Sequence, residues 1–387
     1  MIPDGRQDIN EADVNAVIEV LRSDFLTQGP KVPEFEQTVL DYCKASHAIA
    51  VNSGTSALHI ACRALSVGPG DIVWTSPITF VASANCALYC GAAVDFVDID
   101  PLTYNLSPDR LAEKLDQAEK LGNLPKAVIP VHFSGQPCDI ASIYELSKKY
   151  NFRIIEDASH AIGGRYRGEP IGNCRYSDIT VFSFHPVKVV TTGEGGMCVT
   201  NDTGLAERMT RYRAHGITTK PELMNPRSGE EIWNYQQIDL GHNYRMTDLE
   251  AALGVSQMKR LDEFVSKRHA LAGRYDELLQ DLPVITPWQH PDAYSGMHLY
   301  VIRLKLNEVE RTHRQVYEAT VEHNIGVNLH YIPVYRQPYY EEMGFKKGYC
   351  LEAERYYCDA ISIPVYPRLT YDLQDMVVNV LRDSLQV

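Results

Sequence analysis

The chain has 387 residues, of which 44% are hydrophobic, and its 37 basic and 50 acidic side chains give a formal net charge of -13 at pH 7. Single hydrophobic cores stop growing near roughly 250 to 300 residues, so this length predicts two domains of unequal size. The negative charge repels nucleic acid and anionic membrane surfaces at long range, so we expect neither as a partner.

The nine cysteines are scattered along the sequence without a metal-type CxxC pair, which predicts free thiols in a reducing cytoplasm and no metal site. The first ten residues, MIPDGRQDIN, are polar and lack the apolar region of a signal peptide, so we expect no export. The longest weakly charged stretch, residues 78–97, is interrupted by Ser, Asn and Gly and ends in a strand pattern. We therefore expect it to form a buried helix between two strands and not a membrane span.

Two helices are predicted before the first strand. Asn10 and Asp13 have the spacing of a helix cap, and apolar residues follow at helical spacing as far as Leu21. A second helix is expected after Pro33, with the apolar residues at 35, 39, 40 and 43 on one face.

Seven apolar runs with the character of strands follow, and helical patterns separate them. They are HAIAVN from residue 47, DIVWTS from 71, VDFVDI from 94, AVIPVHF from 127, RIIEDAS from 153, DITVFSF from 178 and GMCVTN from 196. This alternation predicts an α/β domain on a largely parallel sheet that helices cover on both faces. In open sheets of this kind, ligands bind beyond the carboxyl ends of the strands.

The pattern changes after about residue 250. A long helical stretch over 249–282 is followed by the strand HLYVIRLKL from 298, a helix near 311–323 and a segment rich in Tyr and Pro up to 340. No repeat period or low-complexity linker occurs. The sequence therefore predicts a large domain with an N-terminal segment over residues 1–250 and a smaller α+β domain over 251–387.

Polar residues follow the predicted strands at places where a ligand could bind. In RIIEDASHAIGG, Asp157 ends an apolar strand and His160 comes soon after. A partly desolvated carboxylate is stabilised when a cation lies against it, and a protonated pyridine nitrogen is such a cation. A capping or turn aspartate is the alternative interpretation.

Two further motifs have the same placement. In NSGTSALHIA, Gly54, Thr55 and Ser56 lie between a strand and a helix, where free N–H groups and two hydroxyls can bind phosphate, although such residues also serve as simple helix caps. In SFHPVKVVTTGEGG, Lys188 follows a strand among small residues. A lysine held there beside a cationic ring loses its proton readily and attacks a carbonyl, whereas a surface lysine is the alternative.

The three motifs together fit pyridoxal 5'-phosphate (PLP). Its aldehyde needs a lysine, its ring nitrogen needs an anion, and its phosphate needs N–H donors. We therefore predict that PLP is attached covalently to Lys188.

At these residues the chain resembles the nucleotide-sugar aminotransferases of the DegT and StrS type, a branch of the fold type I PLP enzymes. The resemblance covers nearly the whole chain, through the motifs FLTQGP, NSGTSAL, PITFVASAN, EDASHAIGG, SFHPVKVVTTGEGG, GHNYRMTDLEAALG and LHYIPVYRQPYY. It implies a large domain with a mainly parallel seven-stranded sheet and a smaller C-terminal α+β domain. Ordered motifs of this number and length are highly specific.

The resemblance also implies roles for individual residues. Those at the cofactor are Thr55, Ser56 and Ser183 at the phosphate, Phe80 stacked on the ring, Asp157 at the ring nitrogen, His160 on that side of the ring, and the catalytic Lys188. Asn243 would reach the phosphate of the neighbouring subunit's cofactor, which implies a homodimer with shared active sites. The sugar-nucleotide pocket would be lined by Phe25, Leu26, Thr27, Asn328, His330 and Tyr331.

Within the family, FLTQGP, EDASHAIGG and SFHPVK are most similar to the branch of pseudaminic acid biosynthesis. The implied reaction moves the amino group of L-glutamate to C4 of UDP-2-acetamido-2,6-dideoxy-β-L-arabino-hexos-4-ulose and gives UDP-4-amino-4,6-dideoxy-N-acetyl-β-L-altrosamine. Lys188 would be the general base, with ping-pong kinetics. That branch carries an aromatic residue near the start where this chain has Asp4, so another UDP- or dTDP-linked keto-sugar stays open as the acceptor.

Three other functions fit the sequence less well. The dehydratase branch of the family has a histidine where this chain has Lys188. A regulator that only senses PLP would need an attached DNA-binding helix-turn-helix, for which the chain has neither spare length nor basic charge. A nicotinamide oxidoreductase would need GxGxxG after a strand, and VGPGDIV and TGEGGMC both lack the final glycine at the required spacing.

Overall fold

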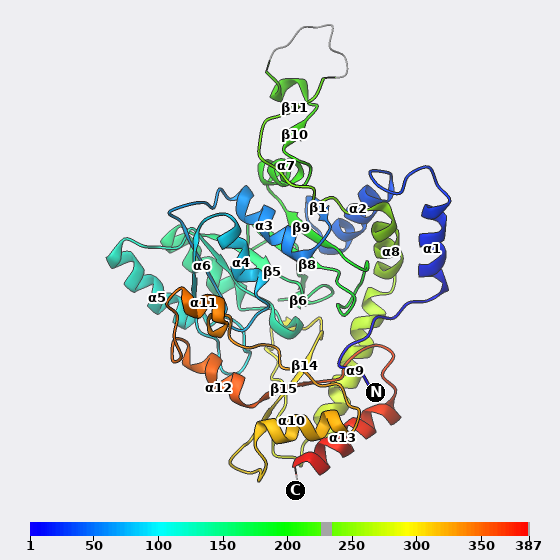
Figure 1. Cartoon of the computed structure of the whole chain (residues 1–387), viewed down its shortest axis with the longest axis vertical. Helices are drawn as coiled ribbons and strands as arrows, with labels where there is room; N and C mark the ends of the chain where they lie inside the picture. The colour runs from blue at the N-terminus through cyan, green and yellow to red at the C-terminus, as the bar shows by residue number, and fades with distance from the viewer. Residues whose placement is uncertain (226–233, 386–387) are drawn as a thin grey trace.

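The computed structural model describes residues 1–225 and 234–385, and its larger part is built on a seven-stranded sheet (Figure 1). The strands in spatial order are β1 (His47–Val51), β9 (Gly196–Thr200), β8 (Ile179–Ser183), β5 (Arg153–Asp157), β4 (Ala127–Ile129), β2 (Ile72–Thr75) and β3 (Ala93–Phe96). Neighbours pair in parallel except at β9, which runs antiparallel to both β1 and β8. The seven predicted strands and the mainly parallel sheet are therefore confirmed.

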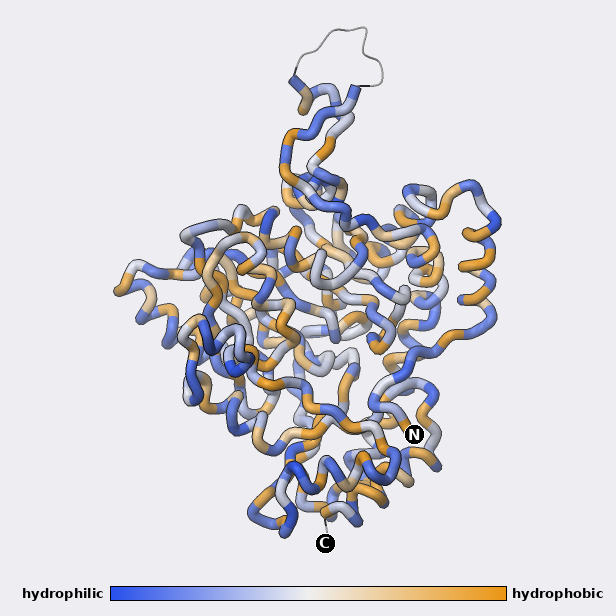
Figure 2. The backbone as a smooth tube through the Cα atoms, in the orientation of Figure 1, coloured by the Kyte–Doolittle hydropathy of each residue, from blue (hydrophilic) through white to orange (hydrophobic). Residues whose placement is uncertain are grey.

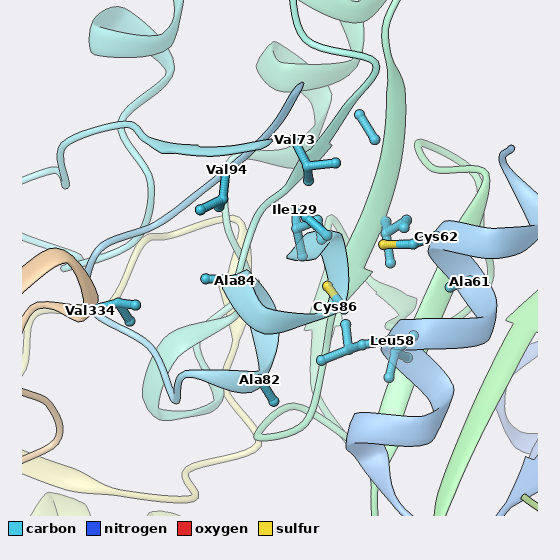
Figure 3. Packing of buried hydrophobic residues seen from close by; sticks show 14 of the residues in the cluster. Leu58, Ala61, Cys62, Val73, Ala82, Ala84, Cys86, Val94, Ile129 and Val334 are labelled. Atoms are coloured by element: carbon cyan, nitrogen blue, oxygen red, sulfur yellow. The ribbon is translucent and has the colours of Figure 1, made fainter. Parts of the chain in front are cut away.

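Helices cover both faces of this sheet, because successive side chains of a strand point to opposite faces. The helices of one face are α3 (Gly54–Ala64), α4 (Ala82–Tyr89) and α7 (Thr203–Tyr212), and those of the other are α2 (Lys31–Cys43), α5 (Pro108–Leu121) and α6 (Ile140–Tyr150). Val73 of β2 packs in the first core with Leu58, Cys62 and Cys86 (Figure 3), whereas its neighbour Trp74 packs in the second.

Local sequence sets the ends of these helices, as α5 shows. The Ser107 hydroxyl accepts a hydrogen bond from the Arg110 N–H, Pro108 occupies the first helical position, and Gly122 ends the helix with φ +69°. The stretch 78–97 contains α4 between β2 and β3, as predicted. In the described part of the chain, no helix is long and apolar enough to cross a membrane.

The C-terminal part is built on an antiparallel sheet of β12 (Val284–Ile285), β14 (Tyr300–Leu304) and β15 (Ala360–Ile363). It forms a third core with α9 (Leu261–Leu278), α10 (His313–Glu322) and α13 (Tyr371–Leu385), whose hydrophilic and hydrophobic residues alternate as in other helices with one buried face (Figure 2). Ile2 lies in this core and bridges to Ile325, so the first residues pack with the last third of the chain. The predicted strand and helix are confirmed, while the domain boundary at 250 stays a prediction.

The remaining α-helices and strands include the buried helix α8 (Asp248–Met258), which packs in the second core, and several short elements. The others are α1 (Glu11–Leu21), α11 (Pro338–Glu342), α12 (Leu351–Asp359), the sheet of β13 (Ala293–Tyr294), β6 (Arg165–Tyr166) and β7 (Glu169–Pro170), and the hairpin of β10 (Ile217–Thr218) and β11 (Gln236–Gln237). The hairpin extends away from the sheet beyond α7 (Figure 1). The nine cysteines are free thiols, and Cys358 is exposed.

Two predicted helix limits are wrong. The stretch 249–282 is not one helix, because α8 ends at Met258 and α9 begins at Leu261. Arg260 between them has φ -112° and ψ 8°, and its guanidinium donates to the carboxylates of Asp8 and Asp13 at 3.2 and 2.7 Å. The N-terminal segment thus stabilises the break between α8 and α9.

The second helix, α2, begins at Lys31 and not after Pro33. Pro33 fits into the first turn of the helix, because the N–H that proline lacks has no partner within the helix at that position.

Asp13 joins the N-terminal helix to the rest of the chain. It completes the predicted capping box with Asn10, and its buried Oδ2 also accepts hydrogen bonds from Gln257 Nε2 and Arg260 Nη2, both at 2.7 Å. One carboxylate therefore starts α1 and fixes it to the junction of α8 and α9.

We expect Asp13→Ala to destabilise the protein by about 3 kcal/mol, because it leaves the cap and the Arg260 guanidinium without their buried anion. Urea unfolding followed by circular dichroism measures the effect. Glu11→Ala removes an exposed acidic residue from the same first turn and is the matched control. Equal unfolding midpoints for the two variants would contradict the role of Asp13.

Candidate active site

A cavity of about 290 Å³ lies beyond the carboxyl ends of β5 and β8. Seven of the residues predicted for the site line it: Thr55, Phe80, Asp157, His160, Ser183, Lys188 and Tyr331. They come from segments far apart in the sequence. The predicted edge of the sheet thus brings together the phosphate cradle, the carboxylate and the lysine.

Asp157 ends β5 with its carboxylate in this cavity and is only 4% exposed. The Ser83 hydroxyl donates to Oδ2 at 2.7 Å, and the hydroxyl and N–H of Ser159 donate to Oδ1 at 2.6 and 3.1 Å. These donors fix the direction of the carboxylate. Ser83 is not among the residues predicted for the site; it stands in PITFVASAN and faces Asp157 because α4 packs against the sheet.

Lys188 follows β8 and is partly exposed to the cavity, although the surrounding protein removes most of the water around its side chain. That desolvation lowers its pKa to about 8, while the negative charge of Asp157 opposes the shift. The neutral fraction of the amine near pH 7 is therefore far larger than in an ordinary lysine, although the ammonium form still predominates. A neutral lysine amine is both a nucleophile and a proton acceptor.

The N-terminus of α3 forms one wall of the cavity. The N–H groups of Gly54 and Thr55 have no partner within the helix at this position and can bind an anion. A Cβ at position 54 would lie 2.9 Å from the Ser183 Cβ, so only glycine leaves this cradle open. Ser56 is buried and does not line the cavity, because its hydroxyl donates to Asn52 Oδ1 at 2.7 Å.

His160 and Tyr331 close the side of the cavity next to Asp157. His160 Nε2 lies 3.3 Å from the Tyr331 hydroxyl, and its buried Nδ1 has no hydrogen-bond partner in the described structure. Burial, followed by the charges of Lys188 and His330, lowers the pKa of His160 well below its usual value. Burial also raises the pKa of Tyr331. Both side chains are therefore neutral near pH 7.

Besides Ser56, six predicted residues do not line this cavity: Phe25, Leu26, Thr27, Asn243, Asn328 and His330. The first three lie in the exposed loop between α1 and α2, and Asn243 is exposed with its backbone bridged to Ala214. His330 Nδ1 lies 2.8 Å from the Ser362 hydroxyl, and Asn328 Nδ2 donates to Asp4 Oδ2 at 3.3 Å. Their roles stay predictions.

The residues that line the cavity fit PLP. The open cradle at Gly54 suits a phosphate, the buried Asp157 carboxylate suits a ring nitrogen, and the Lys188 amine suits an aldehyde. Phe80 is 59% exposed at the cavity and offers an aromatic face to a ring. The N–H donors of the cradle, the Asp157 carboxylate and the Lys188 amine thus agree with the PLP predicted from the sequence.

Comparisons with known proteins agree with this geometry. A model of the DegT/DnrJ/EryC1/StrS aminotransferase family matches residues 7–382. The spore coat polysaccharide biosynthesis protein SpsC of Bacillus subtilis is 38% identical over 98% of this chain and 95% of its own length. The UDP-4-amino-4,6-dideoxy-N-acetyl-β-L-altrosamine transaminase of Campylobacter jejuni is 36% identical over 95% of this chain and 93% of its own.

Among solved structures, PseC of Helicobacter pylori, an aminotransferase involved in the biosynthesis of pseudoaminic acid, superposes with a TM-score of 0.90. It is 30% identical, and the match covers 100% of this chain and 99% of that one. The large mainly parallel sheet with its smaller second sheet is thus the fold of this aminotransferase family.

We expect Lys188 in the PLP-free protein to react with an amine-directed reagent with a midpoint near pH 8, because only the neutral amine reacts. Asp157→Asn should move that midpoint to lower pH, since the lost negative charge had favoured the ammonium form. Mass spectrometry of the labelled peptide measures the rate at each pH. Glu194→Gln, which also removes a charge from the cavity wall, is the control and should leave the midpoint in place.

Proposed function

The chain belongs to the DegT/DnrJ/EryC1/StrS aminotransferase family, and on that premise we propose that it transfers the amino group of L-glutamate to C4 of a UDP-linked keto-sugar. The proposed acceptor is UDP-2-acetamido-2,6-dideoxy-β-L-arabino-hexos-4-ulose. Enzymes of this family use PLP, so PLP is the cofactor. The observation that carries the proposal is the cavity that holds a lysine of lowered pKa beside a buried, hydrogen-bonded carboxylate.

The names of the relatives differ in how closely they relate to the proposed acceptor sugar. The transaminase from Campylobacter jejuni and PseC from Helicobacter pylori are both named for the altrosamine or pseudaminic acid reaction, and both match nearly the whole chain. SpsC, with slightly higher identity, is named for a spore coat polysaccharide. Since one relative is named for the altrosamine amino sugar and another for the biosynthesis of pseudoaminic acid, we take the keto-sugar of that branch as the acceptor.

The side chains have separable tasks in this reaction. PLP, when bound, supplies an aldehyde that condenses with amines and a pyridine ring that accepts an electron pair. Asp157 would hold the ring nitrogen, and the cradle at Gly54, Thr55 and Ser183 would hold the phosphate. The neutral Lys188 amine takes a proton from the α-carbon of glutamate and later delivers a proton to C4 of the sugar.

We also propose a cytoplasmic homodimer with shared active sites. Asn243 supports this, because it is exposed and does not line the cavity of its own chain. Its side chain is therefore free to reach a second subunit. The exposed Phe25 and Leu26 provide apolar area for such a contact.

We expect Lys188→Ala to lower amino-sugar formation by at least about 10⁴-fold, because no other base takes over its proton transfers. The holoenzyme is incubated with L-glutamate and a panel of UDP- and dTDP-linked 4-keto-6-deoxy sugars, and the product is followed by mass. Lys346→Ala, an exposed lysine outside the cavity, is the control.

Full turnover by Lys188→Ala would contradict the reaction itself. Product from dTDP-linked sugars alone would contradict the proposed acceptor and leave the transfer reaction standing. We expect ping-pong kinetics with glutamate and the keto-sugar, because the enzyme retains the amino group after the first half-reaction and transfers it in the second.

A second acceptor, another UDP- or dTDP-linked keto-sugar, is favoured by the position of Asp4. Its carboxylate accepts a hydrogen bond from Asn328, and its charge acts on His330. A Cβ at the next residue, Gly5, would lie 3.7 Å from that of Val187, which lines the cavity. Asp4 thus stands near the mouth of the cavity, where a carboxylate binds hydroxyl donors and an aromatic ring would pack on C–H groups.

We expect Asp4→Tyr to lower kcat/KM for a keto-sugar that presents a hydroxyl there by roughly tenfold, because the carboxylate acceptor is lost. The half-reaction with glutamate alone, followed by absorbance, should keep its rate. Asp4→Asn keeps the size and removes the charge, and we expect a smaller loss. An unchanged kcat/KM in Asp4→Tyr would show that this position does not contact the acceptor.

A further inference from the structure

A second cavity, of about 750 Å³, lies at the edge of the large sheet opposite the active site. Lys126 and Arg153, at the starts of β4 and β5, line it, whereas Asp157 at the far end of β5 faces the first cavity. The carboxyl-terminal ends of α3 and α6 complete its walls. None of the residues assigned to the active site takes part, so we call it the basic cavity and consider it separately.

The lining of the basic cavity is strongly positive. Five basic side chains, Lys126, Lys148, Arg153, Arg175 and Arg208, face one acidic side chain, Asp178. Asp178 pairs with Arg153 at 2.6 Å, which is the one ion pair that these five make with a carboxylate in the described part of the chain. The whole chain has a formal charge of -13, so this concentration of cations runs against its composition.

Neutral partners hold three of the cations in place. Arg208 Nη1 donates to the Ala64 carbonyl at 3.1 Å and to the Ser66 hydroxyl at 3.3 Å. The Lys148 ammonium lies 4.4 Å from the ring centre of Tyr144, and the Arg175 guanidinium lies 5.4 Å from that of Tyr176. Since none of these partners carries a charge, the groups are positioned while their positive charge stays uncompensated.

Two tyrosines give the basic cavity an aromatic wall. The rings of Tyr144 and Tyr176 meet edge to face with their centres 5.7 Å apart, and both line the cavity. Lys148 lies over the Tyr144 ring and Arg175 over the Tyr176 ring, so a nucleobase would displace one of these cations from the ring face or stack on the Arg175 guanidinium plane. The planar guanidinium groups are suited to phosphate oxygens.

We propose that the basic cavity binds a nucleoside diphosphate, with its phosphates on the arginine and lysine side chains and its base against the tyrosine wall. The volume lies within the range of roughly 300 to 1,000 Å³ that holds small ligands. A nucleic acid strand is disfavoured, because the net charge of the chain repels an extended polyanion. The proposal does not depend on which sugar the active site accepts.

Protection of lysines from acetylation tests the site directly. The full PLP-loaded protein is treated with acetic anhydride at constant ionic strength, with and without UDP, and labelling is read by peptide mass spectrometry. We expect UDP to slow the labelling of Lys126 and Lys148 at least fivefold and to leave the exposed Lys346 unchanged. Pyrophosphate should protect these two lysines less than UDP does, because it lacks the base. Uridine should protect them least, because it lacks the phosphates.

A charge-reversed double variant tests whether UDP protects Lys126 by binding in the basic cavity. In Lys148→Glu with Arg175→Glu, acetylation of Lys126 can still be measured, and UDP should no longer slow it. The matched control, Lys346→Glu with Lys347→Glu, makes the same charge change on exposed residues outside the cavity and should keep the protection. Both variants should retain the glutamate half-reaction, which reports that the fold and active site are intact.

Three results would overturn the proposal. Labelling of Lys126 that UDP does not slow would show that no nucleotide binds there. Equal protection by pyrophosphate and UDP would show an anion site without base recognition. Protection that survives in Lys148→Glu with Arg175→Glu would place the bound UDP elsewhere.

Discussion

The chemistry of the active site depends on the exclusion of water from the space that Lys188 and Asp157 share. Desolvation disfavours the charged form of the lysine, whereas the nearby carboxylate favours it, and the first effect is larger because the pKa falls to about 8. Without desolvation the pKa would stay near that of an ordinary lysine, and almost none of the amine would be neutral and able to accept a proton at pH 7. Without the carboxylate it would lose its charge more completely. The two effects together keep the lysine close to its midpoint, where it can both take up and release a proton.

The architecture of the large sheet produces this exclusion. Parallel strands end at a common edge, so β5 and β8 bring Asp157 and Ser183 to the same edge of the sheet although the two residues are far apart in sequence; Asp157 itself pairs with Val181. The antiparallel β9 then closes the site, because Gly196 approaches the N-cap of α3 so closely that a Cβ there would lie 2.3 Å from the Ser53 carbonyl oxygen. The small residues after Lys188 therefore serve the packing of this edge as well as the lysine.

The sequence predicted the features that depend on local pattern. The seven strands followed from apolar runs, and the cap of α1 from Asn10 and Asp13, because each is determined within a few residues. Ser83 and the break at Arg260 were not predictable in this way, because each depends on a partner far along the chain, Asp157 in one case and Asp13 in the other. The packing of Ile2 against Ile325 has the same character. Motifs identified which residues carry the chemistry, whereas their hydrogen-bond partners needed the folded chain.

The polarity of the large sheet also explains why its two edges differ in charge. Helices that return between parallel strands run opposite to them, so their N-termini gather at the carboxyl edge and their C-termini at the amino edge. At the carboxyl edge, the N–H groups of α3 form the anion cradle. At the amino edge, the carbonyls at the end of α3 attract Arg208. That attraction does not account for Lys126 or Arg175, which lie on a strand start and a loop, so the basic cavity has more positive charge than its helix ends require.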